Sequence, residues 1–202
     1  MRNVRVWLST SLGLFVLLLS LGAQQPIDRT HRPAYTPGHE LKFPSDYREW
    51  IFLSSGSGMT YGADIASGSQ DSPAFDNVFV NPASYYEFTR TGHWPDKTTF
   101  VLEIRQSQSQ GSINHGGHFQ RNVTGIEIEV KDAASPSGTW TFYDFPTSLQ
   151  SPGKAARPLP RSASCYSCHA THGAVENTFV QFYPTLFPIA ERLQTVNKPS
   201  NP

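Results

Sequence analysis

The only two cysteines of this 202-residue chain stand three positions apart near its C-terminal end, and a histidine follows the second one directly. On one turn of a helix, Cys165, Cys168 and His169 lie on the same side, so that two thiols and an imidazole can reach one ligand. This Cys-x-x-Cys-His spacing is the one used for c-type attachment of haem, through two thioethers and an axial histidine. The motif therefore predicts one covalent haem c per chain, with His169 as the iron ligand.

Other roles for the two thiols remain open at this point. A short-range disulfide and a thioredoxin-like redox pair are both compatible with an oxidising compartment. Redox pairs of that kind normally follow the first strand of an α/β unit, whereas Cys165 and Cys168 follow every strand that the sequence predicts. A zinc site that also used His169 and His172 would crowd four ligands into eight residues. We expect His172 to lie at the surface or beside the iron ligand.

The N-terminal segment has the layout of a secretory signal peptide. Arg2 and Arg5 precede an apolar run at 12–21, and small residues follow up to Ala23. Polar residues at 9–11 interrupt the roughly 20 apolar residues that a bilayer-spanning helix needs. The sequence therefore predicts a periplasmic or secreted protein, which agrees with haem attachment outside the bacterial cytoplasm.

The remaining chain is long enough for one domain with a core and short for two. We expect a signal peptide at 1–23, an extended arm at 24–40, a haem domain at 41–195 and a polar tail at 196–202. Lys plus Arg and Asp plus Glu both number 16, and no run of like charges occurs. This balance argues against nucleic acid as a partner.

Many turns and short, aromatic-rich strands are indicated by 16 prolines, 15 glycines and 12% aromatic residues. Alternating apolar and polar residues predict an antiparallel sheet of about five strands. These strands are Tyr47–Leu53, Asn77–Val80, Thr98–Arg105, Val123–Val130 and Thr139–Phe145.

A few helices complete the prediction. The first covers Ala83–Thr91, begins with the cap Asn81-Pro82 and ends at Gly92. Another helical region is expected over Val175–Leu193, where two prolines interrupt the pattern. The fold class is therefore mainly β (α+β), with the Cys-x-x-Cys-His motif on a C-terminal helical segment.

Two further places offer ligands for an iron. Met59 is the sole methionine beyond the initiator, and a methionine is the sixth ligand in electron-transfer cytochromes. Its setting, Ser-Gly-Ser-Gly-Met-Thr-Tyr-Gly, favours an ordinary loop methionine. The segment Asn-His-Gly-Gly-His at 114–118 is interpreted as a flexible turn.

Five short motifs accompany the haem motif in a fixed order along the chain. They are Asp46-Tyr-Arg-Glu-Trp50, Val80-Asn-Pro-Ala-Ser-Tyr85, Gly125-Ile-Glu-Ile-Glu-Val-Lys-Asp132, Trp140-Thr-Phe-Tyr143 and Phe179-Val-Gln-Phe-Tyr-Pro-Thr-Leu186. This order, on a mostly β chain with the haem motif close to its C-terminus, resembles the cytochrome P460 family and its relative cytochrome c′-β. The similarity runs from about Leu41 to Leu193.

The resemblance implies an antiparallel sheet, usually in a homodimer, with one five-coordinate c-type haem per chain. P460 enzymes oxidise hydroxylamine and carry a lysine that cross-links to the haem, whereas c′-β proteins bind nitric oxide and similar gases. Leu102 takes the place of that lysine here, and an alkyl side chain cannot form the bond. Lys97 lies five residues away and points to the opposite side of the strand. The family's distal arginine is also missing, because the matching segment reads Ala74-Phe-Asp-Asn77.

An apolar pocket beside the iron is the resulting expectation. Phe100 and Leu102 share one side of their strand, and Phe75 or Phe119 is expected near them. The candidates for the family's distal carboxylate are Asp76, Glu103 and Asp144. An open iron without a strong acid or base favours binding of nitric oxide or related small nitrogen species. Hydroxylamine oxidation and electron transfer to a partner cytochrome are the alternatives.

Overall fold

The computed structural model describes residues 31–60, 68–69, 72–135 and 139–197. The expected signal peptide lies outside these residues, as do the first part of the expected arm and most of the expected tail. Within the described ranges, no helix is long and apolar enough to cross a membrane.

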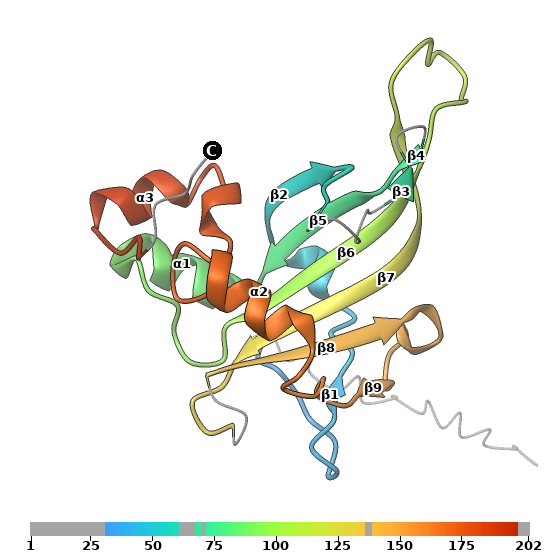
Figure 1. The fold of residues 1–202 in the computed structure, drawn as a ribbon. Helices are drawn as coiled ribbons and strands as arrows, with labels where there is room; N and C mark the ends of the chain where they lie inside the picture. Colours follow the sequence, from blue (N-terminus) through green and yellow to red (C-terminus); the bar gives the residue numbers. More distant parts are fainter. Residues whose placement is uncertain (1–30, 61–67, 70–71, 136–138, 198–202) are drawn as a thin grey trace, which may run out of the picture.

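A five-stranded antiparallel sheet forms the centre of the molecule (Figure 1). Its strands, in spatial order, are β2 (Ile51–Ser57), β5 (Phe75–Val80), β6 (Thr99–Gln108), β7 (Phe119–Lys131) and β8 (Trp140–Pro146). Two short pairs accompany it, β1 (Leu41–Lys42) with β9 (Ala155–Ala156) and β3 (Gly68–Ser69) with β4 (Ser72–Pro73). The predicted mainly β (α+β) class, with an antiparallel sheet of about five strands, is confirmed.

The start of the first predicted strand is wrong. Tyr47–Glu49 forms a 3-10 helix, η1, and β2 begins only at Ile51. The reason lies in tertiary contacts, because the Tyr47 hydroxyl and the Arg48 guanidinium both turn toward the carboxylate of Glu103. At its other end β2 continues beyond the predicted end at Leu53 through a glycine-serine stretch, since Ser57 pairs with Phe75 of β5.

The first helix forms as the sequence predicts. Helix α1 covers Pro82–Thr91, and Gly92 ends it with a φ of 72°, a left-handed conformation that favours glycine. Asn81 precedes the helix, but its side chain accepts a hydrogen bond from the backbone N–H of Thr99 instead of capping α1. Asn81 therefore ties the start of α1 to the start of β6.

The C-terminal part forms several short helices. A 3-10 turn, η2, covers Thr147–Leu149 after β8, and α2 covers Ser164–His172 with the Cys-x-x-Cys-His motif. The expected helical region over Val175–Leu193 is divided into η3 (Val180–Phe182) and α3 (Phe187–Arg192). A proline lies between the two helices and another in the first turn of α3, where its missing N–H does no harm.

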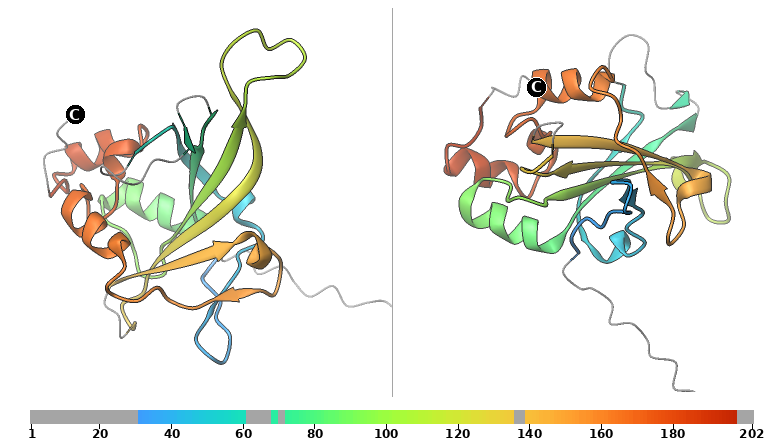
Figure 2. Two further views of the ribbon diagram at one scale, coloured as in Figure 1. Left: turned by 45° about the vertical axis from the view of Figure 1, so that its right-hand side comes forward. Right: turned by 90° about the horizontal axis from the view of Figure 1, so that it is seen from below.

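The sheet has two differently covered faces (Figure 2). In the right-hand view of Figure 2, seen from below, α2 lies on one side of the sheet, and η1 and the N-terminal segment lie on the other. We call these the α2 face and the arm face, the latter covered by residues 31–50. Along β6, Phe100 and Leu102 point to the α2 face, whereas Val101 and Glu103 point to the arm face.

Aromatic side chains close one end of the α2 face. Trp94 stacks on Phe88 of α1 with ring centroids 4.0 Å apart, and meets Phe100 edge-on at 4.7 Å. Each large side chain buried in this way contributes roughly 1.5–3 kcal/mol. Helices α1 and α3 lie at this end of the sheet (Figure 1), and the cavity described below is lined by residues of the α2 face and of α2 itself.

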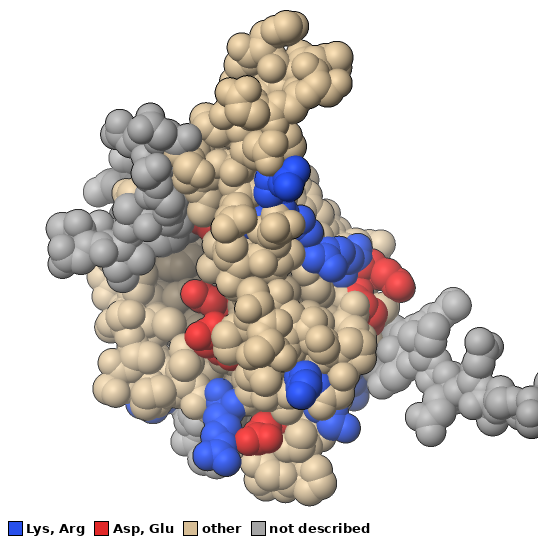
Figure 3. Space-filling model, turned by 90° about the vertical axis from the view of Figure 1, so that its right-hand side faces the viewer, with Lys and Arg blue, Asp and Glu red and all other residues tan. Residues whose placement is uncertain are grey.

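The β6–β7 hairpin projects from the body of the molecule. Its tip, residues 109–118, carries no charged side chain, and Ile113 there is 88% exposed. Figure 3 shows this uncharged tip above a surface on which positive and negative side chains alternate. On the face in view there is no extended patch of one charge.

Candidate haem site

Helix α2 directs the three residues of the haem motif at one cavity. Cys165, Cys168 and His169 all line a space of about 520 Å³, which is closed by the sheet and by the segment 179–183. The two thiols are free. The volume lies within the roughly 300–1,000 Å³ of small-molecule and cofactor pockets. The structure therefore places the three residues of the motif on one cavity, as their spacing on a helix predicts.

The surroundings of the thiols do not suit a thioredoxin-like redox pair. Burial raises the pKa of the Cys165 thiol, and the nearby carboxyl group of Glu127 raises it further. Redox-active cysteines of the thioredoxin type have a lowered pKa, because the thiolate is the reacting form. The structure therefore favours a structural or attached cysteine at this position.

His169 is held as a neutral imidazole with one nitrogen already bonded. Its Nδ1 lies 2.9 Å from the backbone oxygen of Asn177, and its ring packs between Phe142 and Phe179 at centroid distances of 4.6 and 4.4 Å. Burial lowers its pKa to about 4. Over the described ranges, Nε2 has no hydrogen-bond partner. An imidazole fixed through Nδ1 presents Nε2 to a metal, as histidine ligands usually do.

A buried carboxyl group lies directly beside this ring. Glu129 Oε2 is 3.3 Å from His169 Nδ1, yet it has no hydrogen-bond partner within the part of the chain that the structure describes. Burial raises the pKa of Glu129 to about 8, so its carboxyl group is protonated at neutral pH. Two thiols, a neutral imidazole and an unsatisfied buried polar atom around one cavity fit a bound haem c.

The sheet side of the cavity is both apolar and acidic. Leu102 lines it and is paired directly across the strands with Val78 and with Glu127. Asp76 lines the cavity as well, two residues before Val78 on β5. The pKa of Glu127 is raised, mainly by burial and then by Asp144 and Asp76. The expectation of an apolar pocket is therefore only partly right.

The structure separates the four aromatic and aliphatic residues that were expected together. Phe100 and Leu102 line the cavity, but Phe75 and Phe119 do not. Phe75 lies opposite Arg105 and directly precedes Asp76 on β5. Because neighbouring side chains of a strand point to opposite faces, Phe75 belongs to the arm face. Phe119 begins β7 at the projecting hairpin, where its ring packs against Gly111.

The three carboxylate candidates also separate. Asp76 lines the cavity, whereas Asp144 does not, although it is paired with Glu127 across β7 and β8. Glu103 is on the arm face, where its carboxylate accepts hydrogen bonds from four side chains. The donors are Tyr47, Arg48, Asn77 and Arg105.

Glu127 and Glu129 are cavity residues that the sequence argument missed. A signal for them was present in Gly125-Ile-Glu-Ile-Glu-Val, where isoleucine and valine alternate with glutamate. Ile126, Ile128 and Val130 are all buried in the core of the arm face. The alternation therefore required the glutamates to point to the α2 face, which only the position of α2 shows to be a cavity.

A sequence model of the cytochrome P460 family matches residues 44–180. The chain belongs to the cytochrome P460 family. The matched region contains the whole five-stranded sheet, α1, α2 and the haem motif. Membership implies a haem cofactor, in agreement with the donor set of the cavity. A search of curated proteins found no match.

Two further predicted ligand sources have clear places in this P460-family protein. Met59 lines the cavity, packed so closely on Gly56 that a Cβ there would lie 2.2 Å from its sulfur. His172 also lines the cavity, one helical turn beyond His169. The segment 114–118 lies at the tip of the β6–β7 hairpin and does not line the cavity.

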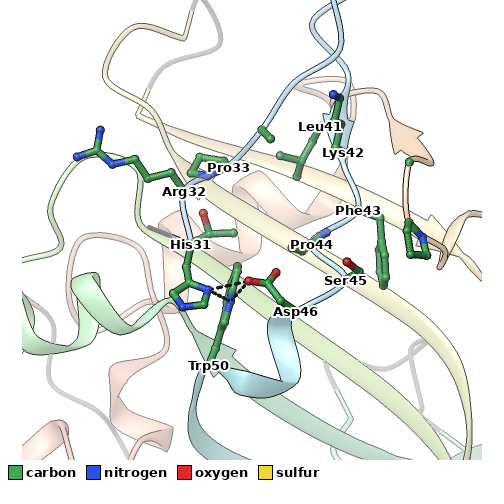
Figure 4. A pocket seen from close by; sticks show the side chains of 14 residues that line it. His31, Arg32, Pro33, Leu41, Lys42, Phe43, Pro44, Ser45, Asp46 and Trp50 are labelled. Carbon is green, nitrogen blue, oxygen red and sulfur yellow. Dashed lines mark hydrogen bonds and ion pairs between the residues drawn. The ribbon is translucent and has the colours of Figure 1, made fainter. Parts of the chain in front are cut away.

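A smaller cavity of about 230 Å³ lies on the arm face (Figure 4). His31 Nδ1 is 2.7 Å from Asp46 Oδ2, and the indole N–H of Trp50 donates to His31 Nδ1 at 3.1 Å. Figure 4 shows that these three side chains converge, so their polar atoms bind one another. This contact attaches the N-terminal arm to the P460 domain.

Proposed function

We propose that this protein is an exported c-type haem protein that binds nitric oxide or a related small nitrogen species. Cys165 and Cys168 would carry the haem through thioether bonds, and His169 would be its axial ligand. When bound, the haem would supply an iron that can take up small ligands. The observation that carries the proposal is the cavity that the two thiols, the imidazole and Leu102 share.

The side chains of this cavity have separable tasks. His169 would hold the iron from α2, with its ring orientation fixed by Asn177 and by two aromatic rings. Phe100 and Leu102 form the apolar part of the sheet side, and an apolar surface favours neutral diatomic ligands over charged ones. Because position 102 carries no amine, no haem–lysine bond is expected there.

The first test is the ligand chemistry of the purified haem protein. We expect a high-spin ferrous spectrum that changes on titration with nitric oxide or carbon monoxide and saturates at one ligand per haem. After proteolysis, the haem should stay with the peptide of Cys165 and Cys168 and not with that of Leu102. A six-coordinate ferrous protein that takes up neither gas would contradict gas binding and support an electron carrier, with Met59 as the first ligand to replace.

Hydroxylamine oxidation is a second candidate, favoured by the carboxyl groups in the cavity. Glu127 has a raised pKa and lies directly beside Leu102, and Asp76 lines the same wall. A carboxyl group so placed can accept or donate a proton during oxidation of a bound substrate. Sustained turnover of hydroxylamine with an electron acceptor, lost in Glu127→Gln, would favour this activity. Negligible turnover in wild type would favour gas binding.

Export and assembly belong to the same proposal. Cleavage of the N-terminal signal segment would deliver the chain to the periplasm or the medium, where haem is attached. We further propose a homodimer and, for the redox alternatives, an electron-transfer cytochrome as partner. The N-terminal mass of the mature protein and its molar mass in solution test the first two points.

A further inference from the structure

The turn after α2 holds the hydrogen-bond partner of His169 in an unfavourable backbone conformation. Val175 and Thr178 are joined by backbone hydrogen bonds in both directions, of 3.4 and 2.8 Å. Between them, φ is 48° at Glu176 and 66° at Asn177. A turn with two positive φ angles suits glycine and asparagine, but a glutamate there is uncommon. Some other interaction must therefore stabilise Glu176 in this place.

The backbone of this turn also lies unusually close to the end of α2. A Cβ added to Gly173 would lie 2.3 Å from the carbonyl carbon of Asn177. Only glycine permits that approach, because the obstructing atoms are backbone and cannot rotate away. The close approach brings the Asn177 oxygen to 2.9 Å from His169 Nδ1.

The side chain of Glu176 is held from two sides. Lys131 Nζ lies 2.7 Å from Oε2, and His93 Nδ1 lies 2.8 Å from Oε1. Lys131 also donates to the backbone oxygen of Trp94 at 2.5 Å, so its own position is fixed. The indole N–H of Trp140 donates to the backbone oxygen of Glu176 at 2.8 Å. These contacts hold both the side chain and the peptide group of Glu176.

We propose that Glu176 is a positioning residue for His169. Its contacts with Lys131 and His93 hold the strained turn, and the turn holds the Asn177 oxygen as acceptor of the His169 N–H. This inference rests on the proposed role of His169 as axial ligand. A hydrogen bond to Nδ1–H raises the basicity of a histidine ligand and so tunes the metal that it binds. Glu176 would thus influence the iron without lining the cavity.

Glu129 is the competing acceptor, since its Oε2 lies 3.3 Å from the same nitrogen. If the turn loosens, the His169 N–H loses its carbonyl partner or turns toward this carboxyl group. Both changes weaken the histidine as a donor to iron, the second less than the first, because a neutral carboxyl group is a weaker acceptor than a backbone carbonyl oxygen. The size of the spectroscopic shift, and not its direction, therefore tells the two apart.

The experiment compares haem-loaded Glu176→Ala, Glu176→Gln and Lys131→Met with wild type. The measurements are the iron–histidine stretching band of the ferrous protein, by resonance Raman spectroscopy, and the reduction potential. We expect the band to move to lower wavenumber and the potential to rise in Glu176→Ala and Lys131→Met. The shift should be smaller in Glu176→Gln, whose amide oxygen still accepts from Lys131.

A matched control is Glu87→Ala, which removes an exposed glutamate that is paired with Arg90 at 2.6 Å. It should leave both readouts unchanged. Unchanged readouts in Glu176→Ala and Lys131→Met, or a band at higher wavenumber, would overturn the inference. If Glu176→Ala does not accumulate with haem, the two milder variants decide. A wild-type protein without an iron–histidine band would instead remove the axial role of His169, and this inference with it.

Discussion

Glu103 and Glu129 lie on adjacent paired strands, β6 and β7, but on opposite faces of the sheet. Both side chains are buried. Burial alone would raise the pKa of Glu103, but hydrogen bonds from Arg105, Tyr47 and Asn77 outweigh it and lower the pKa to about 2. Among the described residues Glu129 Oε2 has no such donor, and burial raises the pKa of Glu129 to about 8.

The difference between the two glutamates shows that the two faces of the sheet differ in how their buried carboxyl groups are hydrogen-bonded. On the arm face, donors from η1, β5 and β6 form hydrogen bonds with the buried carboxylate of Glu103. This buried charge is therefore satisfied by side chains of the protein alone. On the α2 face, the described part of the chain offers no donor to the buried Oε2 of Glu129 beside the imidazole of His169. An unsatisfied group of this kind is typical of a site whose surroundings serve a cofactor rather than stability.

The largest effect is expected from removing what attaches the cofactor to the α2 face. The double variant Cys165→Ala/Cys168→Ala should lose all covalent haem, because no thioether can form. The measurement is the mass of the intact protein after extraction with acidified acetone. Haem that stays covalently attached in this variant would contradict the attachment proposed for the two thiols.

The second largest effect is expected from removing the buried charge of Glu103 on the arm face. Glu103→Gln keeps the shape of the side chain but removes the charge that its arginine and tyrosine donors satisfy. With the pKa lowered from 4.5 to about 2, the expected loss in the free energy of unfolding is about 3 kcal/mol at neutral pH. Urea unfolding of the haem protein measures it. A loss comparable to that of an ordinary surface substitution would break the comparison between the faces.

The same carboxylate predicts how stability depends on pH. A lowered pKa in the folded state means that the unfolded chain takes up the proton first as the pH falls. The contribution of Glu103 is therefore present above pH 4.5 and is lost between 4.5 and about 2. Unfolding curves recorded over this window should show a weaker pH dependence in Glu103→Gln than in wild type. Parallel profiles of the two proteins would argue against the lowered pKa.

The smallest effect is expected at the other glutamate. Below pH about 8 the Glu129 carboxyl group is already neutral, so Glu129→Gln should change the free energy of unfolding by less than about 1 kcal/mol. The two Gln variants are thus a matched pair on paired strands. If Glu129→Gln costs as much as Glu103→Gln, the carboxyl group beside His169 is ionised and paired, and the contrast drawn above is wrong.

Local sequence signals predicted much of the fold. The alternation in β6 and β7, the Pro82 start and Gly92 end of α1, and the family resemblance all agree with the structure and the family match. The strand expected at Tyr47 was wrong, because contacts with Glu103, 56 positions away, turn that segment into η1. A short apolar segment cannot reveal a partner so distant in sequence.

The candidate site was only partly predictable. Cys165, Cys168 and His169 form a local motif with fixed spacing, and α2 places them on one cavity. The opposite wall depends on which side of each strand faces α2. Phe75 was therefore expected in the pocket and lies on the arm face, whereas Glu127 was not expected and lines the cavity.

The sequence by itself determined the haem motif, the strand periodicity and the absence of a lysine at position 102, since each of these depends on residue types at short spacing. Only the tertiary structure decided which carboxyl groups meet the cavity and which are neutralised by donors. It also decided that a strained turn at Glu176 and Asn177 supports His169. The physical reason is that solvation and hydrogen bonding of a buried group depend on neighbours brought together by packing from distant parts of the chain.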